Sequence, residues 1–369
     1  MLQPNHNPFY LTEAQIAHIE NLYQAMTPEE RIGQLFCLIA YRDDDAYFQE
    51  MMRHQPGGVM LRPMPTPAVV ASVRKLQQAS RYPLLLAANL EKGGNGLLSD
   101  GTNYASPMEI AATDDPEMAA RLGRICASEA ARVGVNWAFA PIIDLDRNFR
   151  NPITNTRTFG SDPRRVSAMG RAYVQAVQQG GLAASIKHFP GDGCDERDQH
   201  LAPTVNPLSC EEWDQTYGQV YRDCIRAGAM TVMVGHILQP AWSKRLNPAL
   251  ADREILPGSL SYELVTGLLK ERLGFEGLVV TDATTMAGFN MMAKRSELVP
   301  AAIAAGCDMF LFCKNLDEDF TFMRQGVEQG VITPERLHDA VTKVLALKTA
   351  LQLFEKQTDG TLLPEANAA

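Results

Sequence analysis

The sequence lacks the long apolar runs of a membrane protein. None of its 369 residues belongs to a stretch of about 18 consecutive apolar residues, so no membrane-spanning helix is expected. Residues 1–15 (MLQPNHNPFYLTEAQ) contain no basic segment followed by an apolar one, so no secretory signal is expected either. These absences predict a cytoplasmic protein without a membrane partner.

The sequence also lacks the cysteine spacing of a disulfide or zinc framework. Its seven cysteines are an odd number, no two of them form C-x-x-C, and most lie in apolar runs, which favours buried thiols. No cluster of histidine and cysteine has the spacing of metal ligands, so we expect no metal and no other cofactor. Basic residues are outnumbered 34 to 43, and a formal net charge of −9 argues against a nucleic-acid partner.

What the sequence does contain is a regular alternation of short apolar runs and longer amphipathic segments. Several runs are almost continuously apolar, as expected of parallel strands covered on both faces. The eight runs predicted as strands are 35–40, 57–61, 83–89, 137–143, 183–188, 230–236, 277–282 and 308–313.

Helical patterns separate these runs. Residues 116–134 and 334–352 each open with a proline, and Thr333 is the expected N-cap of the second helix. A helix at about 11–26 is expected to precede the first strand and to cover one end of the molecule. Eight alternations without a repeat or linker predict an α/β fold, a single-domain (β/α)₈ TIM barrel over residues 1–355, followed by a frayed tail over 356–369.

Polar and ionisable residues follow the predicted strands at the end where such a barrel carries its active site. In chain order they are Asn89, Glu91, Asp144, Arg157, Lys187, His188, His236 and Asp282. A long polar segment at 189–207, which contains Asp198 and His200, directly follows the fifth strand. Long loops in small domains are usually functional or mobile, so this segment is a further candidate.

The order of these segments resembles glycoside hydrolase family 3, in its β-N-acetylglucosaminidase branch. The resemblance covers about residues 26–352 and depends on the ordered set of motifs. The matching segments are FAP at 139–141 with Asp144, RTFGSDP at 157–163, IKHFPG at 186–191, DQH at 198–200, MVGH at 233–236, and GLVVTD at 277–282 with Met286 after it.

The resemblance implies that Asp282 is the nucleophile and that His200, paired with Asp198, is the acid/base. Cleavage of a glycosidic bond needs a group that captures an oxocarbenium-like centre and another that protonates the leaving oxygen. Asp198 can hydrogen-bond one ring nitrogen of His200 and fix its tautomer. Gly191 and Gly193 can let this loop swing over the sugar, so we expect closure during catalysis.

The resemblance also implies a set of sugar-binding residues: Arg157, Lys187, His188, Asn89 and His236. His236 is equally expected to support the pocket wall, and Asp144 to position Arg157 or Lys187. Because Lys187 and His188 are neighbours on one strand, only one of them should point inward unless the strand breaks there.

Two segments depart from the family pattern. The family's third-strand signature D-x-E-G-G-R reads NLEKGGN at residues 89–95, which removes a charge-assisted hydrogen bond and the usual arginine. The branch usually has G-H-G where residues 191–193 read GDG, which adds an acid to the loop. Glu91 and Asp192 are given no catalytic role, and altered specificity, an altered pH optimum or lost activity are open outcomes.

These observations predict a retaining exo-β-N-acetylglucosaminidase that acts on small carbohydrates such as peptidoglycan fragments during their recycling. A β-glycoside phosphorylase or a β-glucosidase of the same family is an alternative. Phosphorolysis is suggested by the histidine, which repels attacking phosphate less than glutamate does. A non-catalytic sugar-binding barrel, suggested by Asn89 and Asp192, is a third hypothesis. The oligomeric state is not predicted.

Overall fold

Eight parallel strands form a barrel in the computed structural model, which describes residues 2–365. The strand order is β10-β1-β2-β3-β4-β5-β7-β9, and a parallel bridge between Val280 and Met309 joins the two outer strands. The strands are β1 (Phe36–Ala40), β2 (Gly58–Leu61), β3 (Leu85–Ala88), β4 (Trp137–Ala138), β5 (Ala183–Phe189), β7 (Thr231–Val234), β9 (Leu278–Thr281) and β10 (Phe310–Leu311). Each lies within or overlaps one of the predicted runs, so the predicted (β/α)₈ barrel is confirmed.

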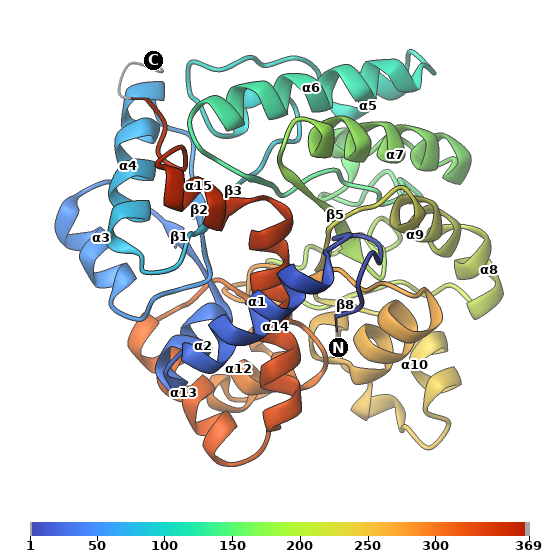
Figure 1. The fold of residues 1–369 in the computed structure, drawn as a ribbon. Helices are drawn as coiled ribbons and strands as arrows, with labels where there is room; N and C mark the ends of the chain where they lie inside the picture. The colour runs from blue at the N-terminus through green and yellow to red at the C-terminus, as the bar shows by residue number, and fades with distance from the viewer. Residues whose placement is uncertain (1, 366–369) are drawn as a thin grey trace.

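Helices surround the barrel (Figure 1). The longer ones are α3 (Asp45–Met52), α4 (Thr66–Ala79), α6 (Pro116–Arg132), α7 (Pro163–Gln179), α9 (Tyr217–Arg226), the π-helix η5 (Glu263–Arg272), α12 (Arg295–Ala304), α13 (Leu316–Glu328) and α14 (Pro334–Ala350). Shorter helices occupy the connections: α2 (Pro28–Gln34), α5 (Pro107–Ala111), α8 (Cys210–Gln215), α10 (Pro240–Leu246), α11 (Ala287–Asn290), and the 3₁₀ turns η1 (Gly94–Gly96), η2 (Asn155–Arg157), η3 (Asp252–Glu254) and η4 (Gly258–Leu260).

The predicted helix starts agree with the structure. Thr333 caps α14 by accepting a hydrogen bond from the amide of Arg336. The opening helix, α1 (Glu13–Ala25), precedes β1 and packs against α14 (Figure 1). The rings of Tyr23 and His338 meet edge to face there, with their centroids 4.6 Å apart.

The C-terminal segment differs from the frayed tail expected after residue 355. Helix α15 (Leu353–Asp359) covers its beginning, Leu362 is buried, and Arg74 donates a hydrogen bond to the carbonyl of Pro364 at 2.7 Å. These contacts tie the segment to the barrel because they bury an apolar side chain and satisfy backbone groups. Residues 366–369 lie outside the described residues.

Two local features of the sheet shape the site. β4 is shorter than its predicted run. Pro141 has no amide proton to donate to a ladder, and beyond Ala138 the chain is joined to β5 by a bridge between Ile142 and Lys187 and by separate backbone hydrogen bonds. An unpredicted two-stranded sheet, β6 (Thr204–Val205) with β8 (Ile237–Leu238), fixes the downstream end of the loop at 189–207.

Within residues 2–365 no helix is both long enough and apolar enough to cross a membrane. All seven cysteines are free, and five of them are buried.

Candidate active site

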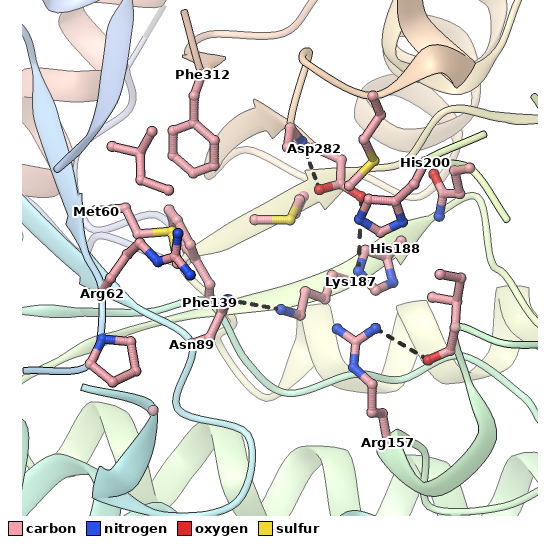
Figure 2. A pocket seen from close by; sticks show the side chains of 18 residues that line it. Met60, Arg62, Asn89, Phe139, Arg157, Lys187, His188, His200, Asp282 and Phe312 are labelled. Carbon is pink, nitrogen blue, oxygen red and sulfur yellow. Dashed lines mark hydrogen bonds and ion pairs between the residues drawn. The ribbon is translucent and has the colours of Figure 1, made fainter. Parts of the chain in front are cut away.

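A cavity of about 400 Å³ opens beyond the carboxyl ends of the strands (Figure 2). The apolar part of its lining includes Met60, Phe139, Met233 and Phe312. Six of the residues predicted for the site line it: Asn89, Arg157, Lys187, His188, His200 and Asp282. Residues separated by up to 193 positions in the sequence therefore share one concave surface, as the barrel topology requires.

Asp282 follows β9 and presents a carboxylate with a side-chain exposure of 11%. Its Oδ1 accepts a hydrogen bond from the amide of Ala283 at 2.7 Å, and its Oδ2 lies 4.0 Å from Nε2 of His188. Burial opposes ionisation, but the nearby rings of His188 and His236, that amide and Lys187 together outweigh it and hold the pKa of Asp282 below its usual value. The carboxylate is therefore ionised at neutral pH and faces the cavity.

His188 is oriented by Asp144, which sequence reasoning had expected to position Arg157 or Lys187. The buried Asp144 carboxylate lies 2.7 Å from Nδ1 of His188 and also accepts that residue's backbone amide. Because an ionised carboxylate only accepts hydrogen bonds, Nδ1 carries the proton in this pair and Nε2 faces Asp282. Asp144 therefore fixes the tautomer and the direction of the His188 ring.

Lys187 and His188 both line the cavity although they are adjacent in β5. The register of β5 against β7 shifts between Ile186 and Phe189, so the regular alternation of side chains is interrupted. This irregularity in β5 allows the side chains of both Lys187 and His188 to point into the cavity.

Glu91 holds two of the cations of the site and was not predicted to do so. Arg157 donates to both of its carboxylate oxygens at 2.9 Å, and Nζ of Lys187 donates at 2.7 Å. Burial disfavours the carboxylate, but the charges of Lys187 and Arg157 outweigh burial and lower the pKa of Glu91 strongly. The third-strand motif contained Glu91, but the sequence could not show that two cations from other strands converge on it.

The side of the cavity next to Asn89 holds cationic side chains that, within residues 2–365, are not all paired with a carboxylate. Oδ1 of Asn89 accepts a long hydrogen bond of 3.4 Å from Nζ of Lys187 (Figure 2). Arg62, which directly follows β2, was also not predicted, and its guanidinium lies 5.7 Å from the ring centroid of Tyr41. Figure 2 places Arg62 across the cavity from Asp282.

His200 reaches the cavity from the loop that follows β5, and Asp198 lies behind it. Oδ1 of Asp198 is 2.6 Å from Nδ1 of His200 and accepts the His200 amide at 2.8 Å. The imidazole is 55% exposed, so Nε2 is the nitrogen available to a bound ligand.

The glycines of this loop are explained by close packing. Gly193 has φ +103°, and a Cβ there would lie 1.9 Å from the carbonyl oxygen of Leu145. A Cβ on Gly191 would lie 2.2 Å from the ring of Tyr217. Closure of the loop during catalysis stays a prediction.

His236 is not among the residues that line the cavity, so the structure gives no support to the predicted contact with the sugar. Its ring is fully buried, with Nδ1 2.8 Å from Oγ of Ser259 and Nε2 3.1 Å from the carbonyl oxygen of Ala283. Both ring nitrogens are used, and burial lowers the pKa of His236 and keeps the ring neutral. It supports the wall next to Asp282, which was the other expectation for this residue.

Among residues 2–365 no group of three or more histidine, cysteine or acidic side chains is arranged to hold a metal ion.

Comparison with known proteins identifies relatives along most of the chain. The family model described as "Glycosyl hydrolase family 3 N terminal domain" matches residues 27–347. A "Beta-N-acetylglucosaminidase/beta-glucosidase" of Cellulomonas fimi is 53% identical over 363 residues, which is 98% of this chain and 64% of that protein. A "Beta-hexosaminidase" of Pseudomonas aeruginosa is 31% identical over 274 residues, covering 72% of this chain and 78% of the relative.

Solved structures agree with the fold. "Beta-glucoside phosphorylase BglX bound to 2FGlc" superposes with a TM-score of 0.95 at 44% identity, covering 99% of this chain and 65% of that one. A glycoside hydrolase family 3 β-N-acetylglucosaminidase from Paenibacillus gives a TM-score of 0.81 at 28% identity, covering 89% and 64%. The chain thus spans just under two thirds of the Cellulomonas relative and of the phosphorylase. With a family model over most of its length and a relative 53% identical, the chain belongs to glycoside hydrolase family 3.

Proposed function

We propose that this chain is a retaining exo-β-N-acetylglucosaminidase that releases terminal N-acetylglucosamine from small glycans by double displacement. One observation carries the proposal: an ionised carboxylate, Asp282, and an imidazole held by a second carboxylate, His200 with Asp198, share one cavity. Such a pair supplies the nucleophile and the proton donor that glycosidic cleavage needs.

The first displacement joins the sugar to the enzyme. A carboxylate oxygen of Asp282 attacks the anomeric carbon while Nε2–H of His200 protonates the leaving oxygen, and Asp198 stabilises the imidazolium before transfer. In the second step the neutral His200 takes a proton from water, which attacks the anomeric carbon and releases Asp282. The configuration at that carbon is inverted twice and therefore retained.

The remaining polar side chains bind the sugar hydroxyls. Arg157 and Lys187 keep donors free beyond those that Glu91 accepts, and His188 offers Nε2. The acetamido specificity is supported by the names of the relatives, which include β-N-acetylglucosaminidase and β-hexosaminidase.

The proposal is tested with aryl β-N-acetylglucosaminide and the matching β-glucoside. We expect faster release from the first, a loss of at least about 10³-fold in Asp282→Asn, and a covalent intermediate that mass spectrometry detects with a 2-fluoro sugar. Preference for the glucoside would favour the β-glucosidase alternative. Sugar binding by calorimetry without turnover of either substrate would favour a non-catalytic barrel.

A second candidate is phosphorolysis, in which phosphate replaces water in the second step. Three cations, Arg62, Arg157 and Lys187, line the cavity, and the carboxylates beside them are those of Asp282 and of Glu91, so positive charge is in excess. The proposed acid/base is an imidazole, which carries no negative charge. A solved structure at 44% identity is named a β-glucoside phosphorylase. Formation of a sugar 1-phosphate that rises with phosphate concentration distinguishes this reaction from hydrolysis.

Two finer points stay predictions: a role in peptidoglycan recycling and a cytoplasmic location. Turnover of N-acetylglucosaminyl muropeptide fragments at rates similar to those of aryl glycosides would support the first. Fractionation of cells that produce the natural protein tests the second.

A further inference from the structure

Gln199 lies between the two proposed acid/base residues, yet it is buried while they are not. Gln199 as a whole residue is 1% exposed, whereas the imidazole of His200 is 55% exposed. The amide group of Gln199 is held at both ends: Nε2 donates to Oδ2 of Asp192 at 2.7 Å, and Oε1 accepts the backbone amide of His236 at 2.7 Å. Removing either partner would leave a buried polar group without a hydrogen bond, which is costly.

The backbone at the same point is bound to α11. The carbonyl oxygen of Gln199 accepts the amide of Gly288 at 2.9 Å, and that of His200 accepts the amide of Ala287 at 3.1 Å. A Cβ on Gly288 would lie 2.8 Å from the Gln199 oxygen, so the contact leaves no room for a side chain there. The tip of the loop is therefore docked on the segment that follows the strand of Asp282.

Asp192 is the hydrogen-bond acceptor for the side-chain amide of Gln199. It is 2% exposed, and its Oδ1 accepts the amide of Gly193 at 2.7 Å and Nδ2 of Asn151 at 2.9 Å, which leaves Oδ2 for Gln199. The amide of Asp192 donates to Asp144 at 2.7 Å, the same carboxylate that orients His188. The acid that distinguishes GDG from the family pattern thus faces inward and links the acid/base loop to a sugar-binding histidine.

We propose that Gln199, through its hydrogen bond to Asp192, is a positioning residue that holds His200 over the cavity in the absence of substrate. The proposal depends on the acid/base role of His200 proposed above. It replaces the picture of a freely swinging loop with one whose tip is fastened by the amide side chain of Gln199 together with two backbone hydrogen bonds to α11. Release of that amide lets His200 leave the cavity while Asp282 and the sugar-binding residues keep their places.

The test is a series of aryl β-N-acetylglucosaminides whose leaving groups range from acidic to weakly acidic phenols. A substrate with a strongly acidic phenol departs without protonation, whereas one with a weakly acidic phenol needs the general acid. We expect Gln199→Ala to lower kcat/KM about 10- to 100-fold on the weakly acidic phenols and only a few-fold on the strongly acidic ones. Gln199→Glu, which keeps the size but places a carboxylate against Asp192, should give the same pattern.

The matched control is Gln77→Ala. Gln77 is also buried, and it bridges two backbone groups of one residue, Leu84, but on α4 and outside the cavity lining. It should lower stability without making the rate depend on the leaving group. His200→Ala provides the second reference and should give the largest dependence.

The two hypotheses fail differently. If His200→Ala shows no dependence on the leaving group, the proposed acid/base role fails. If His200→Ala shows it but both Gln199 variants affect all substrates equally, as Gln77→Ala does, the positioning role alone is overturned. Faster amide hydrogen exchange over residues 194–203 in Gln199→Ala than in Gln77→Ala is expected as well, and equal exchange in the two variants would contradict the proposal.

Discussion

Glu91 and Arg157 form a two-pronged ion pair in the wall of the cavity, with Nε and Nη2 each donating to a different carboxylate oxygen at 2.9 Å. Lys187 adds a third hydrogen bond to the same carboxylate. One acid from the third strand end therefore places two cations from the fourth and fifth strand ends beside the sugar-binding space.

Replacing Glu91 with Gln removes the charge that both cations share. Because Lys187 is buried, an unpaired ammonium is left in the wall, and the cost of breaking a buried pair by removing one partner is about 3 kcal/mol. We expect unfolding in urea to show a loss of that order and the KM for the aryl glycoside to rise. Asp114→Asn, which breaks an exposed pair with Arg165, should change neither quantity measurably. If Glu91→Gln unfolds at the same urea concentration as the unmodified protein, Glu91 does not stabilise the two cations.

Asn89→Asp restores the acid of the family pattern at the end of β3. A carboxylate there would meet Nζ of Lys187, which now donates to the amide oxygen at 3.4 Å, and would accept a charge-assisted bond from a sugar hydroxyl. We expect KM for the glycoside to fall several-fold with little change in kcat.

The same substitution also bears on the choice between water and phosphate. An added negative charge repels an anionic attacking group more than it repels water. If the chain is a phosphorylase, Asn89→Asp should therefore lower the phosphate-dependent rate relative to hydrolysis, as product analysis at several phosphate concentrations would show. An unchanged ratio would place the phosphate away from this side of the cavity or exclude phosphorolysis.

The barrel could be predicted because its signals are local. Runs such as 277–282 are apolar and bounded by turn residues, and the polar residues at their ends, Asp282 among them, sit where parallel strands deliver them. Strand lengths were less predictable, as β4 shows, because Pro141 interrupts the ladder within a run that is apolar throughout.

The supporting contacts of the site could not be predicted for a different reason. The roles of Glu91 and Gln199 come from partners far away in the sequence, and nothing in a polar loop shows which of its side chains will be buried. His236 illustrates the converse: its position after a strand suggested a sugar contact, but Ser259 and a backbone carbonyl use both ring nitrogens.

Arg295 fastens the segment after Asp282 to the neighbouring strand end. It donates to both oxygens of Asp319 at 2.6 Å, to the carbonyl oxygen of Thr284 at 2.9 Å and to that of Phe312 at 3.4 Å. Lysine cannot form the paired bonds of a guanidinium, so Arg295→Lys should lose about 1–3 kcal/mol of stability. Because Phe312 lines the cavity, we also expect a lower kcat/KM for the aryl glycoside. Arg324→Lys, on the exposed part of α13, is the control, and equal behaviour of the two variants would contradict this role.

Lys348 is a buried lysine of α14, and its Nζ donates a hydrogen bond of 2.6 Å to Oε1 of Gln34. Burial lowers the pKa of its ammonium from 10.5 to about 7. Between these two values the unfolded chain holds the proton and the folded chain does not, so the unfolded state binds more protons and the free energy of unfolding rises with pH. The penalty for burying the charge is present in full below pH 7 and disappears as the pH approaches 10.5.

Lys348→Met removes this dependence. Each pH unit within the window is worth up to about 1.4 kcal/mol, so from pH 7.5 to 9.5 the unmodified protein should gain about 2 kcal/mol of stability relative to the variant in urea unfolding. The comparison isolates Lys348 because the buried thiols, whose burial makes stability fall at high pH, are the same in both proteins. Gln34 loses its donor in the variant, which costs about 1–3 kcal/mol at every pH and leaves the slope unaffected. Lys244→Met, at an exposed position, should keep the slope of the unmodified protein. Parallel stability curves for Lys348→Met and the unmodified protein would show that the ammonium stays charged in the fold.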